Sequence, residues 1–172
     1  MNKAKRILEH MDSEKVVTVC TEIGNIADNA TPLRQARYIN EILNTAAQKE
    51  ICMTDTMRKC GGCCLSENAV KIAKKLYKKS SDIVEFLEYL NEADIGGRNL
   101  HISDGKIIAI YKKCYCNIPK KIENMNKVYC ECSAGWYMRL FSEVFEKNVT
   151  VKIVDTIVNG AKECIFEISE FV

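Results

Sequence analysis

The chain of 172 residues lacks the sequence features of exported, membrane-inserted and nucleic-acid-binding proteins. No stretch approaches the ~18 apolar residues of a membrane span, and the start, MNKAKRILEH, lacks the apolar run of a signal peptide. We therefore expect a cytoplasmic protein with no membrane partner. The 25 Lys and Arg nearly balance the 23 Asp and Glu, and the lysines of residues 74–79 are typical of a solvated helix face. We therefore expect no nucleic-acid partner.

The motifs of several large enzyme classes are also missing. There is no glycine-rich phosphate-binding loop, no dinucleotide fingerprint and no serine nucleophile elbow. Histidine occurs only twice, at His10 and His101, and His10 falls in an expected terminal helix. A cysteine–histidine catalytic pair would therefore have to use His101, which lies in an expected strand and is also a candidate ligand-binding residue.

Cysteine, in contrast, is abundant. Of the ten cysteines, seven lie in three clusters: Cys60-Gly-Gly-Cys63-Cys64, Cys114-Tyr-Cys116 and Cys130-Glu-Cys132. Thiols are kept reduced in the cytoplasm, so this clustering indicates metal binding, redox chemistry or thiol catalysis instead of a disulfide framework.

The apolar pattern divides the chain into a helical part, residues 1–97, and a part with strands, residues 98–172. Helices are expected to begin at N-cap signals, which are Ser13, Thr31-Pro32, Ser66 and Ser80-Ser81-Asp82. Gly96-Gly97 ends the helical part. Asp104-Gly105 then predicts a two-residue hairpin turn between strands at residues 100–102 and 106–111.

Two further strands, at residues 149–154 and 163–169, follow a helix that we expect Ser133 to cap. The order strand, strand, helix, strand, strand predicts an antiparallel sheet with helices packed against it, which is an α+β fold. We expect one domain over residues 1–172, because the break at Gly96-Gly97 is too short for a flexible linker. No oligomeric state follows from the sequence, which is compatible with a homodimer.

The two Cys-x-Cys pairs, Cys114/Cys116 and Cys130/Cys132, are the strongest candidate metal ligands. In an extended segment, side chains at i and i+2 share a face, so both members of a pair can bind one ion. The 13 residues between the pairs can fold back and bring four thiolates into one tetrahedral site. An all-sulfur site favours zinc or an iron–sulfur cluster. The alternative is that these thiols are reduced and structural.

Cys60-Gly-Gly-Cys63 has the spacing of a redox dithiol and also of half a metal site. The two glycines lower helix propensity, which predicts a backbone free to wrap a ligand. Arg58 and Lys59 make this segment electropositive, and positive charge lowers thiol pKa values. Cys60 and Cys63 are therefore candidate catalytic residues and candidate metal ligands. An inert loop between helices is the other interpretation.

Trp136 and Tyr137 lie close in sequence to Cys130 and Cys132, and both are candidate ligand-binding residues. Large aromatic side chains beside thiols commonly line a pocket. The simpler interpretation is that they pack in the core.

Two segments carry a resemblance to a known family: CECSAGWYMRLF from Cys130 and VTVKIVDTIVNGAKECIFEI from Val149. Over residues 98–172 the chain is similar to the 4-vinyl reductase domain, and it also resembles bacterial proteins grouped with L-2-amino-thiazoline-4-carboxylate hydrolase. The resemblance implies an α+β fold that encloses a small-molecule pocket. Cys164 matches a last-strand cysteine that holds zinc in phenol-sensing relatives, so it joins the candidate metal ligands. Thr156 and Ile153 stand where the other family ligands would be, so the Cys-x-Cys pairs would have to replace them.

Together these observations predict a small-molecule-binding or sensory domain with a thiolate-rich zinc or iron–sulfur site. The alternative is a small cysteine-dependent enzyme, hydrolase-like or a dithiol redox protein, that uses Cys60 and Cys63. A structural protein with incidental cysteines is the third interpretation.

Overall fold

Most helices begin where a side chain can accept a hydrogen bond from a free backbone amide of the first turn. The computed structural model, which describes residues 2–171, has α1 at Lys3–Glu9, α2 at Ser13–Ile23, α3 at Pro32–Gln48, α4 at Thr54–Gly62, α5 at Glu67–Lys79, α6 at Ile83–Glu92 and α7 at Glu131–Phe145. The side chains of Thr31, Ser66 and Asp82 cap α3, α5 and α6, as the sequence predicts.

Two predicted caps were wrong. Asp12, and not Ser13, accepts the capping hydrogen bond of α2. Helix α7 begins at Glu131, so Ser133 lies within its first turn and does not cap it. In the described part of the chain, none of the helices combines the length and apolar character needed to cross a membrane.

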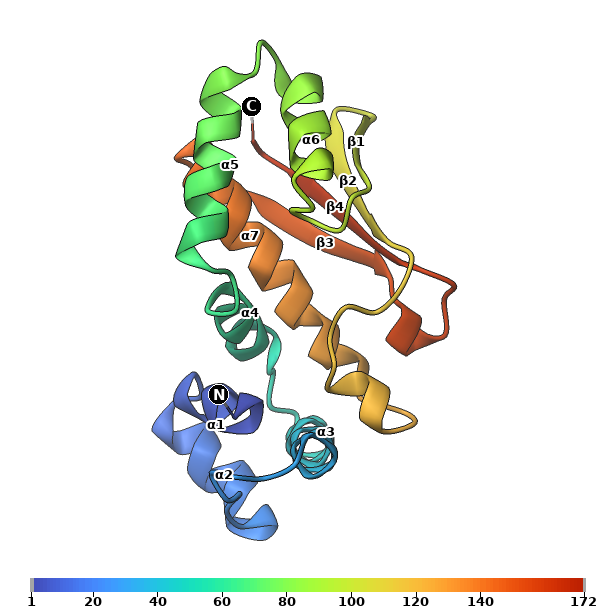
Figure 1. Cartoon of the computed structure of the whole chain (residues 1–172). Helices are drawn as coiled ribbons and strands as arrows, with labels where there is room; N and C mark the ends of the chain where they lie inside the picture. The colour runs from blue at the N-terminus through green and yellow to red at the C-terminus, as the bar shows by residue number, and fades with distance from the viewer. Residues whose placement is uncertain (1, 172) are drawn as a thin grey trace.

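The strands form one antiparallel sheet in the order β1-β2-β4-β3. Their bounds are Leu100–Ser103 for β1, Lys106–Tyr111 for β2, Thr150–Asp155 for β3 and Cys164–Ser169 for β4. Asp104 and Gly105 adopt positive φ angles of 49° and 70°, as the predicted hairpin turn requires. Helices α5, α6 and α7 lie on one side of this sheet (Figure 1), which confirms the α+β class.

Two buried apolar clusters form the core. The first joins the sheet to α5, α6 and α7 around large side chains such as Phe86, Tyr137 and Phe166. The second joins α1 to α4 with Met125 and Tyr129, which precede α7. The break at residue 97 separates α1 to α6 from the strands and α7 along the chain, but packing does not divide there, because α5 and α6 belong with the sheet.

Helices α4 and α7 cross between these two clusters at very short distance. A Cβ atom placed on Gly61 of α4 would lie 1.8 Å from the backbone oxygen of Cys132 in α7, and one on Gly135 of α7 would lie 2.0 Å from that of Arg58. Only glycine permits such an approach. The prediction that Cys60-Gly61-Gly62 is a free loop was therefore wrong: the segment is helical, and its first glycine serves the crossing.

Two arginines, one on each helix, stabilise the crossing through hydrogen bonds. Arg58 of α4 donates to the Glu131 carboxylate at 2.8 Å and to the Val151 carbonyl oxygen at 3.2 Å. Arg139 of α7 donates to the carbonyl oxygen of Gly62 at 3.1 Å. These bonds place the end of α4, with its cysteines, against the first turns of α7.

Candidate functional site

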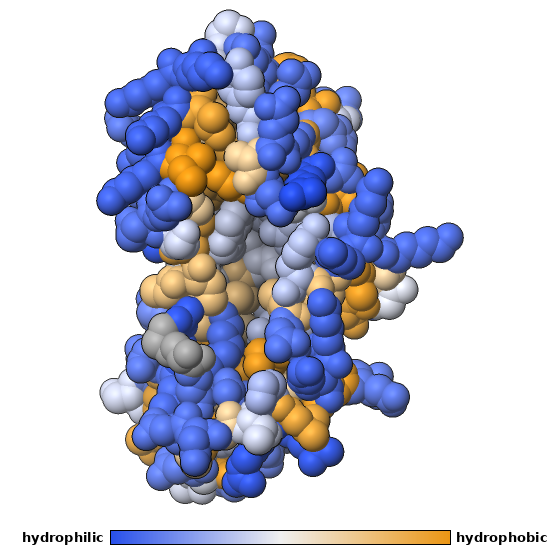
Figure 2. Space-filling view, viewed as in Figure 1, coloured by the Kyte–Doolittle hydropathy of each residue, from blue (hydrophilic) through white to orange (hydrophobic). Residues whose placement is uncertain are grey.

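A cavity of about 340 Å³ opens beside the α4–α7 crossing. Figure 2 shows the surface hollowed at mid-height, between the upper and lower halves of the molecule. The residues that line the cavity are Lys3, Cys64, Asp94, Gly96, Gly97, Tyr111, Tyr115, Cys116, Cys132, Ser133 and Trp136. One wall is therefore aromatic and another carries thiols.

The aromatic wall is fixed by the turn after α6. Gly97 has a φ of 86°, and a Cβ atom on it would lie 2.4 Å from the Tyr111 ring, so the turn can rest on this ring only because glycine is present. Tyr137, buried behind the wall, donates its hydroxyl hydrogen to the Gly96 carbonyl oxygen at 2.9 Å. Trp136 itself lines the cavity.

The thiol wall contains Cys64, Cys116 and Cys132. Cys60, which is fully buried and does not line the cavity, interacts with Cys64, and we call Cys60, Cys64 and Cys132 the thiol cluster. The Cys64 sulfur accepts hydrogen bonds from Lys3 Nζ at 2.9 Å and from Arg6 Nη1 at 3.1 Å. Lys3 Nζ also donates to the Cys132 sulfur at 3.1 Å. Cys64 is exposed, whereas Cys60 and Cys132 are buried. The cluster therefore has one accessible sulfur backed by two buried ones and two cations.

The negative charge of the thiol cluster resides on Cys64. Hydrogen bonds from the Cys132 and Cys60 thiols, together with the Lys3 cation, hold the pKa of Cys64 far below its usual range. The pKa values of Cys60 and Cys132 are raised, first because each thiol donates to Cys64 and second because both are buried. Burial lowers the pKa of Lys3, but the neighbouring sulfur charges outweigh it and raise that pKa overall. The favoured state is a Cys64 thiolate beside a Lys3 ammonium.

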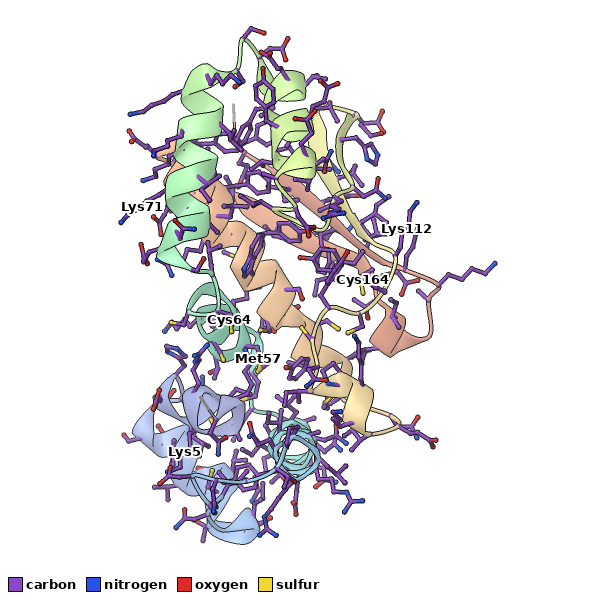
Figure 3. The ribbon with its side chains drawn as sticks, in the orientation of Figure 1. Lys5, Met57, Cys64, Lys71, Lys112 and Cys164 are labelled. Atoms are coloured by element: carbon purple, nitrogen blue, oxygen red, sulfur yellow. The ribbon has the colours of Figure 1, made fainter. Side chains whose placement is uncertain are left out.

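A second group of thiols, Cys114, Cys130 and Cys164, continues from the cluster beyond Cys116. A hydrogen bond from the Cys116 thiol is the main cause that lowers the pKa of Cys114 to about 6. Burial raises the pKa of Cys130 to about 12. Cys164 accepts the Ile157 backbone N–H at 3.4 Å. Figure 3 shows sulfur atoms in a band across the middle of the molecule, from the labelled Cys64 towards Cys164.

The structure does not bring the four Cys-x-Cys sulfurs into the predicted tetrahedral site. Cys132 contacts Lys3 and interacts with Cys64, whereas Cys130 interacts with Thr156 and the charges of Cys164 and Cys114. Across residues 2–171, no three His, Cys, Asp or Glu side chains are arranged so as to hold a metal ion. The predicted ligands therefore lie in one region but in two groups.

The other candidate residues differ in their position relative to the cavity. Cys63 is exposed, follows the end of α4 and does not line the cavity, whereas its neighbour Cys64, which the sequence did not single out, does line it. His101 is exposed on β1 and does not line the cavity. Trp136 lines it, whereas Tyr137 is buried behind it.

Lys3 and Arg6 were missed altogether. They are separated from Cys64 by 61 and 58 residues, so no local motif connects them. Only the docking of α1 against α4 brings the two cations to the thiol cluster.

A family model matches almost the whole chain. The model of a family of unknown function, DUF6144, matches residues 3–171. No curated protein matches the chain. Neither finding tests the resemblance to the 4-vinyl reductase domain or to the hydrolase-like proteins.

Proposed function

Because the chain belongs to a family of unknown function, DUF6144, we propose a function from its site: it binds a small molecule in the cavity and engages it through the Cys64 thiolate. One observation carries this proposal. The Cys64 sulfur, held between Lys3 Nζ at 2.9 Å and Arg6 Nη1 at 3.1 Å, opens into a cavity with an aromatic wall.

The cavity suits a small ligand. Its volume of about 340 Å³ lies within the range of about 300–1,000 Å³ that is usual for small-molecule sites. Trp136, Tyr111 and Tyr115 offer faces and edges against which a flat, mostly apolar molecule can pack. A thiolate would select ligands with an electrophilic or soft centre. We place this activity in the cytoplasm, where thiols are kept reduced.

If the chain is an enzyme, Cys64 is the nucleophile that the geometry favours. Cys60 is fully buried, and Cys63 does not line the cavity. A thiol normally needs an adjacent base, but a thiolate already stabilised by two cations does not. The predicted hydrolase-like or redox activity would therefore use Cys64 in place of Cys60 and Cys63.

Site-resolved alkylation tests the proposal. Limiting iodoacetamide at neutral pH, followed by peptide mass spectrometry, should modify Cys64 before Cys63, the exposed thiol beside it, because Cys64 is held as a thiolate. The matched variants are Cys64→Ser, which should remove the fast phase, and Cys63→Ser, which should keep it. Slow and uniform alkylation of all exposed cysteines would refute a reactive thiolate.

Trp136 provides a second readout, because it is the only tryptophan in the chain and it lines the cavity. A maleimide adduct on Cys64 should change the emission of Trp136, and the same reagent should not do so in Cys64→Ser. If Cys64 is labelled rapidly but the emission of Trp136 does not change, Cys64 does not lie at the cavity. That result would refute ligand binding beside Cys64.

A second candidate function is metal binding by the thiol cluster together with Cys116, as zinc or an iron–sulfur centre. The observation that favours it is that a single cation, Lys3, already lies among these sulfurs. A metal would have to displace Lys3, because its Nζ occupies the space between the Cys64 and Cys132 sulfurs. Metal content and visible absorption of untagged protein purified without oxygen test this. Metal lost on Cys64→Ser but kept in Cys63→Ser would support it, and metal-free protein with titratable thiols would exclude it.

A further inference from the structure

Cys64 and Cys132 face each other across the closest point of the α4–α7 crossing. Both sulfurs accept a hydrogen bond from the same atom, Lys3 Nζ, at 2.9 and 3.1 Å, which places them side by side around this ammonium. Gly61 brings the α4 backbone against that of Cys132 itself. One of the two sulfurs is accessible and the other is buried, which is the usual arrangement of a redox-active cysteine and its resolving partner.

Cys60 is not an equivalent partner. Cys60 lies four residues before Cys64, which follows the end of α4, and the Cys64 sulfur lies 3.4 Å from the Cys60 carbonyl oxygen. Cys60 is fully buried and does not line the cavity, whereas Cys132 lines it together with Cys64. A peroxide in the cavity would therefore meet Cys64 beside Cys132.

We propose that Cys64 and Cys132 form a redox dithiol that reduces a hydroperoxide at the cavity. The Cys64 thiolate attacks the distal oxygen of the peroxide, the O–O bond breaks, and Cys64 becomes a sulfenic acid while hydroxide or alkoxide leaves. Cys132 then gives up its proton and attacks the Cys64 sulfur, which forms the disulfide and releases water. The dithiol loses two electrons, the peroxide gains them, and an external thiol restores the reduced pair.

Lys3 is a positioning residue in both steps. In the reduced state its ammonium stabilises the Cys64 thiolate. The same ammonium also lies 3.1 Å from the Cys132 sulfur, where it can stabilise that thiolate as it forms after Cys64 is oxidised. A cation that touches only one sulfur would serve only one step.

This inference rests on the proposed function, because it uses the same Cys64 thiolate, and it adds a consequence. The disulfide removes the thiolate from the cavity wall. A ligand that is held by the thiolate would bind the reduced protein and leave the oxidised one, so peroxide would control occupancy of the cavity.

The experiment treats the full-length reduced protein with one equivalent of hydrogen peroxide and maps the products by mass spectrometry. The expected product has lost two hydrogens and contains a peptide that links Cys64 to Cys132. In Cys132→Ser and Cys132→Ala, both checked for folding by circular dichroism, Cys64 should instead remain a sulfenic acid that dimedone traps. With excess dithiothreitol, which also reduces a sulfenic acid directly, peroxide consumption should stop in Cys64→Ser and continue in Cys132→Ala and Cys63→Ser.

Several results would overturn the inference: direct conversion of Cys64 to sulfinic acid in the unmodified chain, a disulfide to Cys60, or an oxygen-bridged link between Lys3 and Cys64. If iodoacetamide modifies Cys64 rapidly but no Cys64–Cys132 disulfide forms, this inference fails and the proposed function stands. If Cys64 shows no fast alkylation, the proposed function fails at its thiolate.

Discussion

The α4–α7 crossing depends on the absence of a side chain at Gly61, and a single methyl group there tests this directly. In Gly61→Ala the new Cβ would meet the Cys132 backbone oxygen at 1.8 Å and its carbonyl carbon at 2.6 Å. Both atoms belong to helical backbone and cannot rotate away. The helices must therefore separate by at least about 1 Å, which costs about 1–3 kcal/mol as overpacking.

Gly62→Ala is the matched control. Its Cβ would meet nothing closer than Arg139 side-chain atoms at 3.6 Å, an ordinary contact. Both variants gain helix propensity, up to about 1 kcal/mol, so the difference between them isolates the clash. The expected difference in unfolding free energy between the two variants is about 1–3 kcal/mol. Each kcal/mol shifts Tm by about 2–4 °C for a chain of this size. Thermal unfolding followed by circular dichroism measures it.

The same pair of variants probes the site. Separating the helices moves Cys132 away from Cys64, so Gly61→Ala should also form the Cys64–Cys132 disulfide more slowly than Gly62→Ala under equal peroxide. Equal melting temperatures for the two variants would show that the helices do not approach as closely as described, and would refute the reasoning.

Two further predictions concern thiol ionisation. Lys3→Met removes a cation 2.9 Å from Cys64, so the pKa of Cys64 should rise and its thiolate absorbance should be lost at a higher pH during acidification, whereas Lys5→Met, which loses an exposed pair with Asp28, should leave this loss unchanged. The same acid-side loss in both variants would contradict this role of Lys3. The alkylation rate of Cys114 should rise through about pH 6 and then level off, because its pKa is lowered to about 6, and quantitative peptide mapping across pH measures this midpoint. A midpoint near that of an ordinary thiol would be the contrary result.

Local signals in the sequence predicted most of the fold. Thr31 before Pro32, Ser66 and Asp82 each carry an oxygen that caps the following amides, and Asp104-Gly105 can adopt the positive φ angles of a tight hairpin. These are properties of neighbouring residues, so they can be inferred without tertiary structure. The α7 start was misplaced because Ser133 is a good cap residue that lies within the helix.

The site depended on tertiary contacts, and the sequence predicted it only in part. Gly61 was interpreted as a source of loop freedom, although a helix that crosses another closely also needs glycine. Once Cys60-Gly61-Gly62 is taken as helical, Cys63 and Cys64 both fall near Cys60, at spacings of three and four residues, so helical spacing alone does not choose between them. The contribution of Lys3 could not be inferred, because 61 residues separate it from Cys64.

The most direct test of a Cys64 thiolate at the cavity wall is its ionisation in the intact chain. The ultraviolet absorbance of thiolates should be followed from about pH 8 to about pH 4 in the unmodified chain and in Cys64→Ser, with Cys63→Ser as the control. The difference between the unmodified chain and Cys64→Ser should equal one thiolate and persist to acid pH, since the pKa of Cys64 is held far below its usual range. Cys63→Ser should retain this signal. A difference that vanishes below about pH 8 would show that Cys64 is an ordinary thiol and would contradict the account.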